Sequence, residues 1–269
     1  MGYKSGKLFE VPIGSDGKVV VTSLAERVYM IMWNSAPDNR LTTSFCDAIH
    51  TALDILALKY PHGVVITTSG ISKFYSNGLD LEHYNANPAF AKDSLFALWK
   101  RLLTYPMPTI ALVNGHCFAG GLMVAMMHDY RIMNPHRGYV CLNEVDIGVP
   151  LKAAMSSVFR QKCSPQTYRT LVLEGRRFKA LEALEAGIID GVGGLDEVVK
   201  FVEELGLVSK TDKGIYGLLK KEMWRETVAF LDAPDDEPEY KEKVKKQDEE
   251  LEKKAKARVK DWEAAKAKL

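Results

Sequence analysis

Short runs of β-branched and aromatic residues mark the first 35 residues, and they predict β-strands. The three runs rich in β-branched and aromatic residues are Lys7–Val11, Val19–Thr22 and Val28–Trp33. A turn is expected at Ser15-Asp16-Gly17, between the first two strands. After a cap at Thr43 or Ser44, apolar side chains recur every three or four residues from Phe45 to Leu56, which predicts a helix.

Two further strands are predicted by continuous apolar runs, at Gly63–Thr68 and Thr109–Val113. Such runs fit strands of a parallel sheet that is covered on both faces. The other elements expected in this half are a helix at Ser94–Leu103, a turn at Asn114-Gly115, a helix at Ala119–Asp129, and strands at Tyr130–Met133 and Tyr139–Leu142. Strands that alternate with helices predict an α/β core.

The strand pattern fades after Pro150, and helices alone are expected from there. Their ranges are Lys152–Arg160, Pro165–Leu173, Ala180–Ala186, Leu195–Glu203 and Ile215–Leu231. We therefore expect a core over 1–195 and an α-helical C-terminal region over 196–269. Within that region, Asp235–Lys268 is dense in charges of both signs with a narrow apolar stripe, which predicts a solvated, exposed helix.

Composition excludes several classes of protein. The chain has 269 residues, 46% of them hydrophobic and 26% charged, which is typical of a folded globular protein and not of a disordered one. Its formal net charge of +1 gives no reason to expect a nucleic-acid partner. No apolar run reaches the roughly 18 residues of a membrane-spanning helix. The four irregularly spaced cysteines are expected to be reduced thiols.

Glycines that follow two predicted buried or extended segments are the first candidates for a catalytic site. Gly120 and Gly121 lead into a helix, whose first amides lack intrahelical acceptors and favour negative charge. Gly78 permits a turn that directs another amide into a cleft. Two such amides would form an oxyanion hole, in which one donor is worth about 10²–10³ in rate. The alternative for the glycine pair is close packing of a helix against a strand.

Glu144 follows an apolar strand, and a desolvated carboxylate there would have a raised pKa that suits a general base. Alternatively, this carboxylate is bonded to backbone amides. Asp146 is the competing acid, for which we expect a structural role. His116 and His128 lack a completing ligand set, so no metal site is expected, and Cys117 fits a buried position better than a nucleophile. A serine nucleophile elbow is absent from the sequence.

Taken together, these segments resemble the enoyl-CoA hydratase/isomerase (crotonase) superfamily from about Val19 to Val192. The matching pieces, in order, are Asn39-Arg40-Leu41, Gly78-Leu79-Asp80-Leu81, Pro108–Ala125, Asp129-Tyr130-Arg131-Ile132 and Ala180–Asp190. The resemblance implies an α/β fold with a crotonase-like ββα spiral core and a C-terminal α-helical region. It also implies acyl-CoA thioester substrates and a homotrimer or a dimer of trimers.

By position, the resemblance implies that the Leu79 and Gly120 amides hold the thioester oxygen and that Glu144 is the catalytic acid/base. Hydratases of the superfamily carry a second glutamate where this chain has Met123. A single carboxylate suits proton transfer, and Cys141-Leu142-Asn143-Glu144 looks particularly like Δ3,Δ2-enoyl-CoA isomerases. The expected reaction moves the double bond of 3-enoyl-CoA to trans-2-enoyl-CoA. The alternatives are a hydratase or another acyl-CoA enzyme of the superfamily, and a non-enzymatic scaffold.

Further expectations concern substrate contacts, cofactors and location. No cofactor is expected, because coenzyme A is part of the substrate. The terminal Ala267-Lys268-Leu269 is a conservative variant of the Ser-Lys-Leu address, which predicts a peroxisomal import receptor as a partner and the peroxisome as the location. Arg40 is a candidate contact for the CoA phosphates or, alternatively, a solvated surface residue. The other candidate substrate contacts are Ser76, Asn77, Gly78, Phe118, Met123 and Val149.

Overall fold

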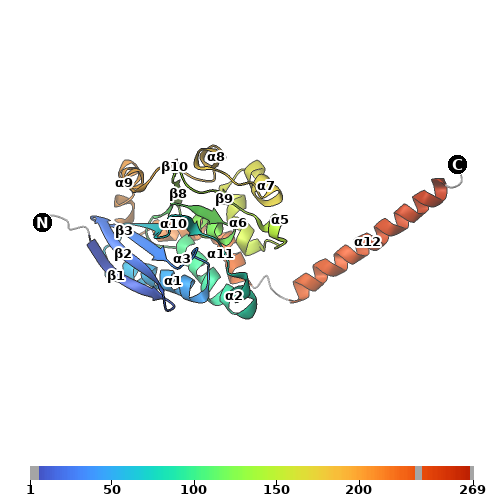
Figure 1. The fold of residues 1–269 in the computed structure, drawn as a ribbon, viewed down its shortest axis with the longest axis horizontal. Helices are drawn as coiled ribbons and strands as arrows, with labels where there is room; N and C mark the ends of the chain where they lie inside the picture. The colour runs from blue at the N-terminus through green and yellow to red at the C-terminus, as the bar shows by residue number, and fades with distance from the viewer. Residues whose placement is uncertain (1–5, 234–237, 267–269) are drawn as a thin grey trace. The chain divides into compact units, whose positions relative to one another are not determined.

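The computed structural model describes residues 6–233 and 238–266 and has a mixed α/β architecture (Figure 1). Its main sheet has seven strands in the order β1-β2-β3-β4-β6-β8-β10. β1 to β3 form an antiparallel meander, and every later neighbour pairs in parallel. These strands are β1 (Gly6–Ile13), β2 (Gly17–Ala25), β3 (Val28–Asn34), β4 (Val64–Ser69), β6 (Thr109–Val113), β8 (Tyr130–Met133) and β10 (Gly191–Val192).

Both faces of this sheet are covered, which explains its continuous apolar strands. One face packs in the main core with α1 (Thr43–Lys59) and α3 (Ala97–Leu103). The other face carries a separate cluster in which α9 (Leu195–Glu204) contributes Val198 and Val202. Adjacent strand residues therefore enter different cores: Val65 lies in the first cluster and Ile66 in the second.

A second, smaller sheet holds three short parallel strands in the order β5-β7-β9. These are β5 (Phe74–Ser76), β7 (His116–Phe118) and β9 (Val140–Cys141). Ser76 is level with Cys117, and Phe118 is level with Cys141. Because each strand follows a strand of the main sheet in the chain, the backbone alternates between the two sheets in a spiral.

Helices complete the described fold. Between the sheets' strands lie α2 (Leu81–Ala86), the π-helical turn η1 (Ala91–Phe96), α3, α4 (Gly120–Met126) and α5 (Glu144–Ile147). After β9 and α5 come α6 (Ala153–Lys162), α7 (Pro165–Glu174), α8 (Ala180–Glu185), α9, the 3₁₀ turn η2 (Ser209–Thr211), α10 (Tyr216–Met223), α11 (Arg225–Asp232) and α12 (Pro238–Lys266).

The chain forms two compact units, Met1–Asp232 and Ala233–Leu269. The helices α9 to α11, which the sequence assigns to the C-terminal region, therefore belong to the first unit by their contacts. Within the second unit, the described side chains of α12 are almost all exposed, as expected for a solvated helix. The terminal Ala267-Lys268-Leu269 lies outside the described residues.

Several predicted boundaries are wrong. The first long helix begins one residue earlier, because the side chain of Thr42 accepts the Phe45 N–H at 3.3 Å. The helix expected at Ala119–Asp129 is shorter, and β7 precedes it. The strand β10 was missed, because two residues carry no detectable period. The helix expected at Ile215–Leu231 is divided at Trp224 into α10 and α11.

Candidate active site

Three predicted site segments follow the carboxyl ends of the three strands in the small sheet. Gly78 and Leu79 follow β5, Gly120 follows β7, and Glu144 follows β9. The strands are parallel and adjacent, so their carboxyl ends lie along one edge. The sheet thus gathers backbone amides and a carboxyl group that are far apart in the sequence.

The Leu79 peptide is held by a bridge to Leu41. The Leu41 N–H donates to the Gly78 carbonyl at 2.9 Å, and the Asp80 N–H donates to the Leu41 carbonyl at 3.3 Å. Such a parallel bridge uses the groups that flank Leu79, so the N–H of Leu79 itself points away from Leu41. Gly78 has φ +84°, a left-handed conformation that glycine adopts without strain.

The two glycines that begin α4 have different surroundings. A Cβ added to Gly121 would lie 2.4 Å from the Ser76 carbonyl oxygen, so this glycine serves close helix–strand packing. A Cβ on Gly120 would lie 3.3 Å from the Leu79 amide nitrogen, so the Gly120 and Leu79 backbones are neighbours. The two sequence interpretations therefore apply to different residues, with packing at Gly121 and the candidate oxyanion amide at Gly120.

Ala119 sets the direction in which α4 begins. Its φ of +48° is rare for a residue with a side chain, and its N–H donates to the Cys141 carbonyl at 3.0 Å. This bond extends the β7–β9 pairing by one residue before the chain turns into the helix. Strained backbone of this kind is concentrated at functional sites, where the surrounding structure holds it.

Glu144 is the first residue of α5 and lies three positions beyond β9, so the expected place at a strand end is slightly wrong. The residue is only 6% exposed, and its Oε2 has no hydrogen-bond partner among the described residues. Burial raises the pKa of this carboxyl to about 7, and a hydrogen bond from its own backbone N–H opposes the rise. The short helix ends at Gly148, whose left-handed backbone lets its N–H return to the Glu144 carbonyl.

Polar side chains join the loop that follows β3 to the glycine turn that follows β5. Arg40 donates to Asp38 at 3.1 Å and to the Leu79 carbonyl at 3.0 Å, so it holds the peptide that follows the candidate oxyanion amide. The Ser76 hydroxyl donates to the Asn39 carbonyl at 2.8 Å, and Asn77 donates to the Asp38 carboxylate at 2.6 Å. Contacts of Arg40, Ser76 and Asn77 with substrate stay predictions, alongside these roles within the loop.

Asn39 is a supporting residue whose role the sequence did not reveal. It is fully buried with φ +54°, and its side-chain amide donates to the Ser69 hydroxyl at 2.7 Å. The same amide reaches the carbonyls of Phe74 and Tyr75 in β5. Asparagine tolerates left-handed backbone better than most residues. This preference was the feature of the sequence that could have indicated the role of Asn39.

The three apolar candidates for an acyl pocket differ in burial. Met123 lies one turn into α4 and is 1% exposed. Phe118 and Val149 are half-buried, and the Phe118 ring lies 4.8 Å from that of His116. The N–H of Val149 donates to the Glu144 carbonyl at 3.0 Å, which keeps that residue close to α5. Their contact with an acyl chain stays a prediction.

A buried chain of hydrogen bonds connects β4, β5 and α4. His128 Nδ1 lies 2.9 Å from the Val124 carbonyl, which can only accept, so this nitrogen carries the hydrogen. Burial lowers the pKa of His128 to about 3, so the ring is neutral and Nε2 accepts from the Thr67 hydroxyl at 2.9 Å. The Tyr75 hydroxyl must then donate to Thr67 at 3.0 Å. This chain of hydrogen bonds, in which every donor is fixed, joins the strand before Gly78 to the helix that begins at Gly120.

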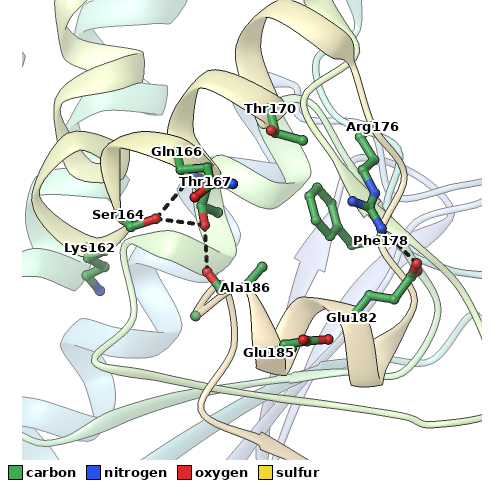
Figure 2. Close-up of a pocket in the computed structure, with 11 residues that line it drawn as sticks. Lys162, Ser164, Gln166, Thr167, Thr170, Arg176, Phe178, Glu182, Glu185 and Ala186 are labelled. Carbon is green, nitrogen blue, oxygen red and sulfur yellow. Dashed lines mark hydrogen bonds and ion pairs between the residues drawn. The ribbon is translucent and has the colours of Figure 1, made fainter.

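A cavity of about 640 Å³ lies between α7 and α8 (Figure 2). Its polar groups bond to one another: Thr167 donates to the Ala186 carbonyl at 2.9 Å, and Arg176 pairs with Glu182 at 2.9 Å. None of the predicted site residues lines it. It borders Phe178, which pairs with Val140 at the beginning of β9 and not at the carboxyl end. This cavity is therefore separate from the candidate active site.

The described residues contain no group of three or more His, Cys, Asp or Glu side chains that could hold a metal ion. All four cysteines are unpaired and buried, including Cys117, for which the sequence predicts a buried position. Burial raises the pKa of the Cys117 thiol well above its usual range, which disfavours a thiolate nucleophile. Within the described part of the chain, no helix has the length and apolar character to cross a membrane.

Comparison with known sequences identifies relatives over most of the chain. The family model for enoyl-CoA hydratase/isomerase matches residues 25–233. The peroxisomal enoyl-CoA delta isomerase 1 of Arabidopsis thaliana is 31% identical over 213 residues, which are 76% of this chain and 88% of the relative. The enoyl-CoA delta isomerase 3 of the same plant is 36% identical over 183 residues, 63% of this chain and 77% of the relative.

Solved structures share the fold. The human mitochondrial delta3-delta2-enoyl-CoA isomerase superposes with a TM-score of 0.69 at 22% identity, covering 88% of this chain and 98% of the human one. An enoyl-CoA isomerase of Mycobacterium tuberculosis gives a TM-score of 0.70 at 23% identity, covering 81% and 96%. These likenesses confirm the predicted crotonase-like fold. With the family match over most of its length, this chain belongs to the enoyl-CoA hydratase/isomerase family.

Proposed function

We propose that the protein is a Δ3,Δ2-enoyl-CoA isomerase that uses Glu144 as its only proton carrier. The observation that supports this most is the buried Glu144 carboxyl, which has a pKa of about 7 and an unpartnered Oε2 among the described residues. A base with a pKa near the working pH accepts and returns a proton with little bias. The isomerase names of the relatives support the same reaction class.

The reaction begins with a 3-enoyl thioester, whose C2 protons are acidic because their loss gives a conjugated dienolate. The Glu144 carboxylate removes one C2 proton, and negative charge moves to the thioester oxygen. The N–H groups of Leu79 and Gly120 donate to that oxygen and stabilise it. Protonated Glu144 then returns the proton to C4, which gives trans-2-enoyl-CoA. The shift is redox-neutral and needs no cofactor besides the CoA of the substrate.

Met123 supports isomerisation over hydration. It places a buried thioether one turn after Gly120, where the superfamily's hydratases carry a second carboxylate. Adding water to a double bond requires a water molecule to be held and activated, a task usually shared by two carboxylates. We therefore propose that water addition to crotonyl-CoA is slow compared with double-bond migration.

The test is to measure conversion of 3-enoyl-CoAs of several chain lengths by the absorbance of the conjugated product. Glu144→Gln should lower kcat by about 10²–10⁴-fold while the protein stays folded. Asp146→Asn is the matched control, because Asp146 lies two positions away on α5 and is exposed. Turnover of Glu144→Gln at the wild-type rate, or faster hydration than isomerisation, would contradict the proposal.

We further propose peroxisomal location, through recognition of Ala267-Lys268-Leu269 by an import receptor, and assembly as a homotrimer or dimer of trimers. Two Arabidopsis relatives carry peroxisomal names, whereas the human relative is named mitochondrial. The terminal tripeptide is therefore the feature of this chain that favours the peroxisome.

A further inference from the structure

The helix α12 carries apolar side chains that stay largely exposed among the described residues. It runs over 29 residues from Pro238 to Lys266, beyond the end of the family match at residue 233. Leu251, Val259 and Trp262 are 61%, 53% and 62% exposed, and Val244 is 37% exposed. A polar helix stable through its own ion pairs would not need these side chains.

These apolar residues lie on one side of the helix. At 100° per residue, Val244, Leu251, Val259 and Trp262, together with the half-buried Ala255, fall within about a quarter of the circumference. We call this set the α12 stripe. Four of its five members are symmetric about residue 253: Val244 and Trp262 lie equally far from that point, as do Leu251 and Ala255, whereas Val259 corresponds to Gln247. Val244 and Trp262 are 18 residues apart, which is five turns of 3.6 residues. This period fits straight helices better than a long supercoil.

Charges on α12 are arranged with a polarity that specifies a direction. The segment 248–252 contains four acidic residues and no basic one, and the segment 254–258 contains three basic residues and no acidic one. The two segments lie equally far from residue 253. Within the helix, an ion pair between Lys256 and Glu252 at 2.6 Å joins the acidic segment to the basic one. The acidic segment of one helix therefore complements the basic segment of a second helix that runs the opposite way.

We propose that α12 is a self-association element, in which the α12 stripes of two copies of this chain pack antiparallel about residue 253. In this arrangement Val244 of one copy meets Trp262 of the other, and each acidic segment lies beside a basic one. A parallel pair would place acidic segments together, which like-charge repulsion opposes. An anionic membrane surface would face Asp248, which lies within the arc of the α12 stripe, and Glu252 beside it, so a second copy is the better occupant.

The experiment uses the full chain with single thiols introduced beside the stripe, by Gln247→Cys and by Arg258→Cys. Antiparallel packing brings position 247 of one copy beside position 258 of the other, because the two lie at nearly equal distances from residue 253. The four native cysteines are buried and unpaired, so they do not compete. The two proteins are mixed in a glutathione redox buffer, and disulfide-linked peptides are identified by mass spectrometry. This readout reports α12 contacts whatever the association of the remaining chain.

The expected result is that the mixed 247–258 disulfide dominates over both symmetric ones. Adding Leu251→Lys to both proteins should reduce its yield about tenfold or more, because a charged group replaces an apolar contact in each copy. Ala257→Lys is the matched control, which adds the same charge on the opposite side of α12 and should leave the yield unchanged. Neither residue belongs to the candidate active site.

Three outcomes would overturn the proposal. Dominant 247–247 and 258–258 disulfides would mean parallel packing. A mixed disulfide no more abundant than in the Leu251→Lys pair would mean that α12 is solitary. Sedimentation of the wild-type chain with phosphatidylserine–phosphatidylcholine vesicles, lost in Leu251→Lys and without cross-linking, would assign the α12 stripe to a lipid surface.

Discussion

The carboxyl group of Glu144 is buried in a place where ionisation is unfavourable. Its pKa is raised from 4.5 to about 7 by burial, with no charged side chain among the causes. The folded protein therefore keeps a proton that the unfolded chain has released between these pH values. The free energy of unfolding should fall as the pH rises from 4.5 to about 7, by about 3 kcal/mol for a shift of this size.

Glu144→Gln should remove this pH dependence. We expect the variant to gain stability relative to the wild type as the pH rises, by about 3 kcal/mol between pH 4 and pH 8. Urea unfolding of both proteins at these two pH values measures the difference in their free energies of unfolding. The difference at pH 4 gives the effect of replacing the carboxyl group by an amide, and it is subtracted from the difference at pH 8. A difference that does not change with pH would mean that Glu144 is ionised without cost.

The same carboxyl should control the pH profile of the reaction. Only its ionised form can remove a C2 proton, so kcat/KM for a 3-enoyl-CoA should rise with pH and level off above an apparent pKa of about 7. Asp146→Asn should keep this profile. A profile that is flat from pH 5 to pH 8 would exclude Glu144 as the titrating base.

Single residues were predictable where chemistry marks them in the sequence. Glu144 stands out as an acid after an apolar strand, and Gly120 as a small residue before a helix. Thr67, Tyr75 and His128 could not be found in this way, because their hydrogen bonds join residues up to 61 positions apart. Their partners exist only once the spiral brings the strands together.

At the level of elements, the glycine at position 121 controls how closely α4 approaches β5. An added Cβ would lie 2.4 Å from the Ser76 carbonyl oxygen and 2.9 Å from the Ser76 Cβ, and this backbone has little freedom to move. Gly121→Ala should therefore cost about 1–3 kcal/mol of stability and lower kcat, because it separates the Gly120 and Leu79 amides.

Gly6→Ala is the control for this substitution, since an added Cβ there has no atom within 4 Å. Thermal unfolding and isomerase assays of both variants provide the measurement. Equal melting temperatures and equal rates for the two alanine variants would show that α4 tolerates the methyl group, and that the close approach has no functional role.

The longer strands of the main sheet were predictable from the sequence, and the short strands β7 and β10 were not. The bounds of β6 and β8 agree with the expected Thr109–Val113 and Tyr130–Met133, and β6 has the continuous apolar run of a buried parallel strand. The strand β7 was missed, since three residues with a histidine among them show no period. That strand places Gly120 at the same edge of the small sheet as Glu144, so the sequence indicated the candidate site residues without showing what aligns them.

At the level of the whole molecule, the terminal tripeptide should decide where the protein is found. A fluorescent protein fused before Met1 leaves Ala267-Lys268-Leu269 free, and we expect this fusion to enter peroxisomes. Deleting the tripeptide should leave it in the cytosol. Import that persists after the deletion would mean that another signal directs the chain, and mitochondrial fluorescence would contradict the proposed location.

The small sheet that bears the candidate site has strands of only three, three and two residues. So few ladder bonds can open locally while the seven-stranded sheet and its two cores persist. Gentle warming should therefore abolish turnover several degrees below the loss of helical circular dichroism, and cooling should restore it. Catalytic competence in this protein would then have its own melting point, set by eight residues of backbone and not by the fold as a whole.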